Sequence, residues 1–237
     1  MTKDWAVPPE PDRWNSNPQR RLLKDPKPRS PEERYAVTTP SSLGAVMDLL
    51  GPPAPQHGGT ADAWREIESG LGFALPDDYK TIVDAYAPVC LYEHLYLHHP
   101  ATERWNLGRW ISETVTAWSE VDWDTDIDGD PRKVLGTAEL RFGTPGGLTP
   151  LLSSDRGETV FLAQDHAGSP LLFAEDGDEQ FFCLRVSFAE WLRRYVSGED
   201  AVGPGSGIFY PGPVKFRSLP QTPQDTGSVW FGPDRGM

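Results

Sequence analysis

The chain has 237 residues, 38% of them hydrophobic, so it can bury one core of ordinary size. It holds 22 Lys and Arg against 35 Asp and Glu, a net charge of −13, and so acidic a chain repels nucleic-acid phosphates. No apolar run approaches the ~20 residues that cross a bilayer, and no apolar segment follows the first residues. We therefore expect a cytoplasmic protein that binds neither membranes nor, directly, nucleic acid.

The sequence lacks the usual signatures of catalysis and of cofactor binding. The two cysteines, Cys90 and Cys183, lie far apart in apolar contexts, which is typical of reduced thiols in a reducing compartment. Ser206 is flanked directly by glycines, whereas a nucleophile elbow has its glycines two residues away on either side. We expect no catalytic residue and no cofactor, and an enzyme without a recognisable motif is the least favoured alternative.

The two ends of the chain differ in composition from the middle. Residues 1–35 are rich in Pro, Arg and Asn and have no hydrophobic period, which predicts a disordered extension. Residues 201–237 form a Gly/Pro-rich tail in which regular structure is not expected, although its aromatic residues would allow it to lie as a strap across the domain. Residues 36–200 have the periodicities of one folded domain.

Three helices are expected in the first part of this domain. The first covers residues 42–50, and the second begins near Thr60 and ends at Gly72. The third starts at Pro76, a residue favoured in the first turn of a helix, and ends before Pro88, which forbids continuation. In the second and third, apolar residues recur every three or four positions, as in a helix with one buried face.

Strands and two further helices are expected next. A strand is predicted at residues 90–97 and a helix from about Thr102. Short strands, separated by Gly, Pro and Asp turns, follow at residues 133–142, 148–152, 159–163, 170–173 and 180–186. Ser187 and Glu190 form a capping box that opens a last helix, which Gly198 ends. This order predicts an α+β fold, with N-terminal helices, a mainly antiparallel sheet and a closing C-terminal helix.

Two neighbouring segments resemble the signature of the SUKH (Smi/Knr-like) superfamily. They are Trp64-Arg65-Glu66-Ile67-Glu68 and Leu71-Gly72-Phe73-Ala74-Leu75-Pro76-Asp77-Asp78-Tyr79-Lys80. In that family a helix bearing Trp and Glu leads through a Gly turn into a second helix. The resemblance covers roughly residues 42–198 and implies a SUKH-like fold. It also implies a structural role for the motif residues: Trp64, Ile67, Glu68, Leu71, Gly72, Leu75, Pro76 and Tyr79.

The superfamily includes fungal regulators of cell-wall synthesis and many bacterial immunity proteins of polymorphic toxin systems. The resemblance implies an immunity or antitoxin-like protein, which neutralises a cognate toxin, for example a nuclease, by occupying its surface. The alternative is a regulatory adaptor or scaffold that binds several partners. Because the domain is acidic, the expected partner is a basic protein toxin, and the protein itself is expected to be a monomer or a weak oligomer.

One run has an acidic residue at every second position: Glu120, Asp122, Asp124, Asp126, Asp128 and Asp130. An extended strand would place these carboxylates on one face, ~6.6 Å apart, and would turn Val121, Trp123 and Ile127 toward the core. The functional interpretation is an acidic ribbon that binds basic residues of a toxin. The alternative is a solvated edge or loop, which is the more common structure for a run of like charges.

Two patterns resemble metal sites, but neither is complete and no metal is expected. Residues 124–129 match the first positions of a calcium-binding EF-hand loop, but Leu135 stands where that loop requires a bidentate Glu. His94 and His98 would share a metal only on a helix. Their surroundings favour a strand instead, which would place them ~13 Å apart.

Overall fold

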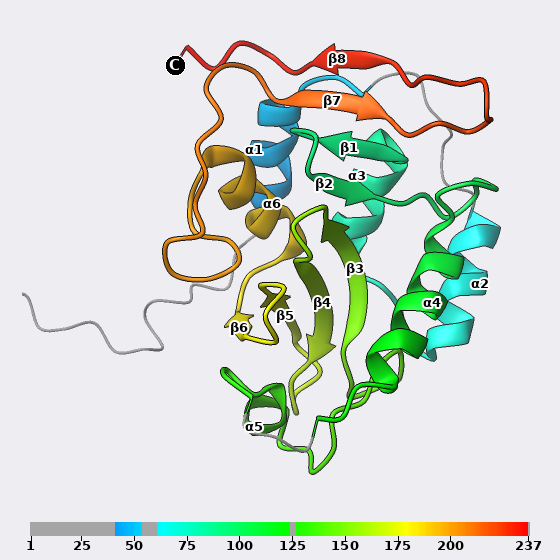
Figure 1. The fold of residues 1–237 in the computed structure, drawn as a ribbon, viewed down its shortest axis with the longest axis vertical. Coiled ribbons are helices and arrows are strands. Elements are labelled where there is room, and N and C mark those ends of the chain that lie inside the picture. Colours follow the sequence, from blue (N-terminus) through cyan, green and yellow to red (C-terminus); the bar gives the residue numbers. More distant parts are fainter. Residues whose placement is uncertain (1–40, 54–60, 124–126, 237) are drawn as a thin grey trace, which may run out of the picture. The chain divides into compact units, whose positions relative to one another are not determined.

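The computed structural model describes residues 41–53, 61–123 and 127–236 (Figure 1). The extension expected over residues 1–35 therefore lies outside the described residues. Within them the protein is an α+β domain built on one eight-stranded sheet. No helix in the described ranges is long and apolar enough to cross a membrane.

The sheet has the strand order β6-β5-β4-β3-β2-β1-β7-β8, and every neighbouring pair is antiparallel. Its strands are β1 (Val89–Leu91), β2 (Leu95–Leu97), β3 (Thr149–Ser154), β4 (Thr159–Gln164), β5 (Pro170–Glu175), β6 (Phe181–Leu184), β7 (Lys215–Ser218) and β8 (Val229–Phe231). Most neighbours are consecutive in the chain. The exception is β7, which returns to the free side of β1 and continues the sheet. The expected antiparallel sheet is confirmed.

The described residues contain six helices: α1 (Ser41–Leu50), α2 (Ala61–Leu71), α3 (Asp77–Tyr86), α4 (Leu107–Ser119), α5 (Pro131–Leu135) and α6 (Phe188–Ser197). The first three and the last confirm the helices expected there. Pro76 precedes α3 as its N-cap, with an extended ψ of 138°, rather than forming its first residue. α4 begins later than predicted, because the side chain of Asn106 caps it by accepting a hydrogen bond from the Arg109 N–H.

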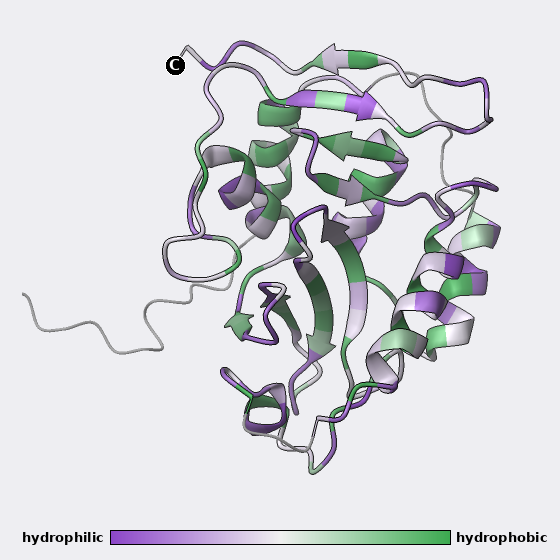
Figure 2. Cartoon of the chain, viewed as in Figure 1, coloured by the Kyte–Doolittle hydropathy of each residue, from purple (hydrophilic) through white to green (hydrophobic). Residues whose placement is uncertain are grey.

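Strands β4 and β5 bury both of their faces. In β4, Val160 and Leu162 belong to one hydrophobic core, whereas Phe161 and Ala163 belong to another, as the alternation of a strand requires. The first core joins the sheet to α1, α3 and α6, and the second joins it to Trp123, to α5 and to part of α4. Figure 2 shows hydrophobic residues concentrated along these central strands. The helices therefore cover the sheet from two sides.

The SUKH-like segment lies at the junction of α2 and α3. α2 is followed by Gly72, whose φ is 78°, and the chain then passes through Pro76 into α3. Ile67 packs against the first core without being fully buried. Four apolar residues of the segment are buried in that core: Trp64, Leu71, Leu75 and Tyr79. The segment is thus a pair of amphipathic helices, as its periodicity predicts.

Polar contacts fix this junction. The Glu68 carboxylate accepts hydrogen bonds from the Leu75 N–H at 2.9 Å and from Lys80 Nζ at 3.0 Å. The buried hydroxyl of Tyr79 donates to the Leu151 carbonyl of β3 at 2.8 Å. Burial raises the pKa of Tyr79, so the hydroxyl stays protonated and remains a donor. The two bonds of Glu68 set the angle between the helices, and Tyr79 attaches α3 to the sheet.

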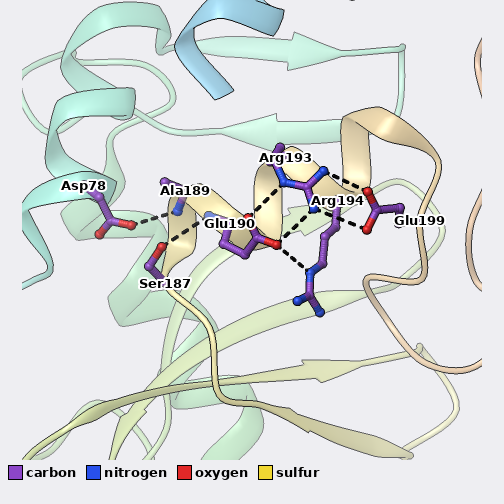
Figure 3. Close-up of polar contacts among 7 residues, drawn as sticks. All are labelled: Asp78, Ser187, Ala189, Glu190, Arg193, Arg194 and Glu199. Atoms are coloured by element: carbon purple, nitrogen blue, oxygen red, sulfur yellow. Dashed lines mark hydrogen bonds and ion pairs between the residues drawn. The ribbon is translucent and has the colours of Figure 1, made fainter. Parts of the chain in front are cut away.

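Two side chains anchor the N-terminus of the closing helix α6 (Figure 3). Ser187 Oγ accepts a hydrogen bond from the Glu190 N–H at 3.2 Å, which confirms Ser187 as the N-cap. Asp78, on α3, accepts one from the Ala189 N–H at 2.8 Å. The Glu190 carboxylate forms ion pairs with two arginines of its own helix, instead of completing a capping box. α6 is therefore held to α3 by a charge-assisted bond across the core.

Two of the expected strands are wrong. Residues 90–97 form a hairpin of β1 and β2, because Tyr92 and Glu93 adopt φ angles of 51° and 66° that reverse the chain. Residues 133–142 contain the end of α5 and a loop. The side chain of Asp130 caps α5 and the following proline opens it, so a helix covers the start of the segment predicted as a strand.

The expectation of little regular structure in residues 201–237 is also wrong. β7 and β8 lie in this tail and extend the sheet beyond β1. Phe216 of β7 is fully buried, and its ring stacks on Tyr86 at 5.6 Å and on Trp230 at 5.1 Å. The folded domain therefore continues past residue 200.

Asp78→Ala tests the anchor between α3 and α6. The substitution leaves the Ala189 N–H without its partner, so we expect the free energy of unfolding to fall by about 1–2 kcal/mol. Urea denaturation measures this change. Asp77→Ala is the matched control and should have little effect, since the neighbouring carboxylate is exposed and, among the described residues, pairs with Lys80 alone. Equal losses in the two variants would show that Asp78 is no anchor.

Candidate binding surface

The acidic run of residues 120–130 is not an extended strand in its described part. Glu120 closes the end of α4 in a helical conformation, and the last residues of the run form a turn that leads into α5. Trp123 and Ile127 are buried as expected, but Val121 is exposed. The expected extended strand is therefore wrong for the described residues of the run, because Glu120 ends a helix and Asp128 and Gly129 lie in a turn.

The acidic residues of this run lie in different environments. Glu120, Asp122 and Asp128 are exposed. Asp124 and Asp126 lie outside the described residues. Asp130 is buried and accepts hydrogen bonds from the Arg132 N–H at 2.9 Å and from Arg132 Nε at 3.0 Å. Burial opposes ionisation of Asp130, but the bonds from Arg132 outweigh it and lower its pKa. Asp130 is thus a helix cap rather than a contact residue.

Asp128 lies beside a second acidic segment, the β5–β6 turn of residues 175–179. The Phe181 N–H donates to the Asp128 carbonyl at 2.9 Å. Gly129 has no room for a side chain there, since a Cβ would lie 1.7 Å from the Phe181 carbonyl oxygen. The two segments enclose a depression of about 310 Å³. The carboxylates that line it are here called the acidic face: Asp128, Asp176, Asp178 and Glu179.

Internal hydrogen bonds hold the β5–β6 turn in one conformation. Glu175 Oε1 accepts from the N–H groups of Gly177 and Glu179, both at 2.9 Å. Asp176 Oδ1 accepts from the Asp178 N–H at 2.9 Å. In the described part of the chain, no Lys, Arg or His forms an ion pair with the acidic face. Like charges are therefore gathered on a fixed turn without a counter-charge.

A second depression, of about 260 Å³, shares Glu179 with the first. Its wall contains Trp118 and Trp123, whose rings stack 5.5 Å apart with only 7° between their planes. Glu175 lines it although only 2% of this residue is exposed, and its Oε2 has no hydrogen-bond partner. Burial raises the pKa of Glu175 to about 7. This depression is here called the tryptophan pocket, and it is lined by Ala117, Trp118, Val121, Trp123, Gly157, Glu175, Gly177 and Glu179.

A larger depression, of about 420 Å³, lies between α2 and α4. Small and apolar side chains provide most of its lining, and its charged residues, Glu66 and Arg109, are exposed. It brings together no buried polar group that lacks a partner. In contrast, the depression beside the β5–β6 turn contains Glu175, a buried carboxyl with an oxygen that has no partner.

The histidines singled out in the sequence have separate surroundings. His94 Nδ1 lies 2.8 Å from Asp155 Oδ1, whereas the His98 ring stacks on Trp110 at 4.7 Å. Burial lowers the pKa of His98 to about 4, so this ring is neutral at physiological pH. Across residues 41–53, 61–123 and 127–236, no three His, Cys, Asp or Glu side chains are arranged to hold a metal ion.

The nucleophilic side chains have structural surroundings. Cys90 and Cys183 are free thiols, and burial raises the pKa of each, which makes a thiol a poor nucleophile. The Ser206 hydroxyl accepts from the backbone N–H groups of residues 201–203 and donates to the Gly203 carbonyl at 2.7 Å. Ser206 therefore closes a loop after α6.

Sequence reasoning found only part of this surface. Asp128 belongs to the alternating run, but the acidic residues of the β5–β6 turn did not stand out as a site. The available signal was the segment Glu175 to Glu179, four acids and a glycine between two strand-like runs. Its proximity to Asp128 depends on strand pairing, which no local pattern reveals.

No family model matches the chain, and no curated protein or solved structure matches it either. Its function is therefore inferred from its own residues and their geometry. The features that bear on function are the acidic face, the tryptophan pocket and the SUKH-like helix pair.

Glu175→Gln tests the buried carboxyl of the tryptophan pocket. A folded-state pKa raised to about 7 contributes stability that is complete below the unfolded-state value, near 4.5, and is lost as the pH rises through 7. The variant has no such titration. Between pH 5 and pH 8 the wild type should therefore lose about 2 kcal/mol more of its free energy of unfolding than the variant does.

Urea denaturation at the two pH values measures this difference. Glu179→Gln is the matched control, since its carboxylate is exposed on the same turn, and it should follow the wild type. If the difference in free energy of unfolding between Glu175→Gln and the wild type is the same at both pH values, the carboxyl of Glu175 is not held in its neutral form.

Proposed function

We propose that the protein is a SUKH-type immunity protein that neutralises a basic protein toxin by covering part of its surface with the acidic face. The proposal depends on one observation: the carboxylates of the acidic face surround a single depression and have no counter-charge among the described residues. The SUKH-like segment adds to it, because many members of that superfamily are immunity proteins.

Electrostatics favours a basic partner for this surface. The whole chain carries a net charge of −13, and the acidic face adds a local concentration of negative charge. A basic toxin surface would relieve the repulsion among these carboxylates and would be steered toward them during diffusion. Acidic surfaces of other proteins would be repelled by these like charges, so the same surface provides specificity.

The acidic face is organised before a partner arrives. Glu175 and Asp176 fix the β5–β6 turn through main-chain hydrogen bonds, and the turn is joined to Asp128 through Phe181. A surface that needs little ordering retains more of its interaction energy as affinity. Such rigidity suits tight inhibition of one partner better than the weak binding of several, which a regulatory adaptor would require.

Co-expression with the product of the neighbouring gene tests the proposal. That product alone should arrest bacterial growth, and the wild-type protein should restore growth and form a stable complex with it. The variant Asp128→Lys, Asp178→Lys, Glu179→Lys should bind about 100-fold more weakly, or about 3 kcal/mol, because it places like charges against the toxin. Calorimetry measures the affinity.

A second triple variant with the same change in net charge is the control. It carries Glu66→Lys, Glu103→Lys and Glu113→Lys, at exposed sites on α2, before α4 and on α4. Rescue should be retained by this variant. If both variants rescue growth equally, the acidic face is not the contact. Binding of several unrelated proteins with similar weak affinity would instead identify an adaptor.

The salt dependence of the association rate tests whether the acidic face attracts the toxin electrostatically. Raising the salt concentration to about 0.5 M shortens the screening length to a few ångströms, so the rate should fall at least ~10-fold. Stopped-flow fluorescence with the wild-type complex measures it. The Asp128→Lys, Asp178→Lys, Glu179→Lys variant should show a much smaller salt effect. An unchanged wild-type rate would rule out steering.

A further inference from the structure

We infer that a second copy of this chain pairs with the open edge of the sheet, strand β8 against strand β8, to form a symmetric dimer. The inference goes beyond the proposed function and does not depend on it. It follows from three features of β8: the direction of its main-chain groups, the exposure of its side chains and the charges beside it.

The main chain of β8 has hydrogen-bonding groups that point away from the sheet. β8 ends the eight-stranded sheet of the described residues (Figure 1). Toward β7, the Ser228 carbonyl accepts from the Ser218 N–H at 2.9 Å, and the Gly232 N–H donates at 2.8 Å to the residue that precedes β7. Because this direction alternates along an antiparallel strand, Val229 and Phe231 direct their N–H and carbonyl groups to the open edge.

The same two residues have exposed apolar side chains. Val229 is 50% exposed and Phe231 is 59% exposed. Trp230 lies on the opposite face, where its ring stacks on Phe216 at 5.1 Å, and it is only partly buried. A hydrophobic edge with free main-chain groups is a template for another strand. The edge therefore offers both the hydrogen bonds and the apolar surface that an added strand would cover.

A second β8 fits this edge in a symmetric register. With a two-fold axis at Trp230, Val229 of each copy lies opposite Phe231 of the other. Both residues direct main-chain groups outward, so each such pair can exchange both of its hydrogen bonds. The apolar side chains of the two residues then cover each other across the axis. Pro233, the next position in the alternation, has no N–H, which confines the pairing to β8.

The charges beside β8 favour a second copy over a basic partner. Lys215 and Arg217 of β7 lie opposite Phe231 and Val229, on the same face of the sheet. Both form ion pairs with Glu93, and one carboxylate shared by two cations leaves an excess of positive charge. A basic protein would be repelled from this edge. In the dimer the two β8 strands separate the cations of the copies by about 14 Å, beyond the screening length of ~8 Å.

The contact is small, and it leaves the acidic face accessible. Each copy contributes a strand of three residues, and so short an interface falls below the ~1,200 Å² of stable complexes. We therefore expect a dissociation constant of about 100 µM. The acidic face adjoins β5 and β6, at the other end of the sheet from β8. Each copy in the dimer would thus keep its acidic face free.

Analytical ultracentrifugation of the full chain from about 10 µM to about 1 mM tests the inference. The average mass should rise with concentration from near 26.3 kDa toward twice that value. Phe231→Lys puts a charge on the pairing edge and should weaken association at least ~10-fold. Ile208→Lys is the matched control, because it makes the same change at a residue that is 44% exposed in the loop after α6. It should associate like the wild type.

Hydrogen exchange of the wild-type chain tests the pairing itself. The Val229 and Phe231 amides should exchange about 4-fold more slowly at about 1 mM than at about 10 µM, because exchange requires the monomer. The Trp230 amide, which faces β7, should not change.

The dimer is refuted by a mass that stays near 26.3 kDa at every concentration. Association that survives Phe231→Lys, or that leaves the Val229 and Phe231 amides unprotected, would also overturn it. If these amides become protected only when a different protein is added, the edge binds that protein and not a second copy.

Discussion

Strands β4 and β5 bury side chains on both faces, and this requirement fixes the positions of the other elements. One face needs α3 and α6, which Tyr79 and Asp78 join to the sheet and to each other. The opposite face is covered by Trp123, α5 and the end of α4, which places the tryptophan pocket beside the β5–β6 turn. The candidate surface is therefore a consequence of how the second core is closed.

The described helices other than α5 were predictable because their signals are local. Apolar spacing and caps such as Ser187 depend on neighbours within a turn or two. The β7 strand was missed because its pairing partner, β1, lies far away in the sequence, and its Gly- and Pro-rich surroundings resemble a linker. The hairpin at Tyr92 was missed because no Gly or Asn marks its left-handed residues.

The site was less predictable than the fold. An alternating acidic run suggested a strand, but a cap at Asp130 and the end of α4 override that periodicity locally. The chemistry of the pocket depends on Glu175 lying near Trp118 and Trp123, three residues brought together only by packing. A buried glutamate at the end of a strand is indistinguishable in sequence from an exposed one, so its unpartnered oxygen is visible only in the folded structure.

The return of β7 to β1 has a consequence for biosynthesis. β1 is made early, but the strand that covers its open side is made long after it, beyond every other element except β8. While the ribosome is still translating the segment between them, a hydrophobic hairpin exposes unpaired main-chain groups. The nascent chain is thus most prone to wrong pairing during this interval, and a chaperone that shields β1 would act then.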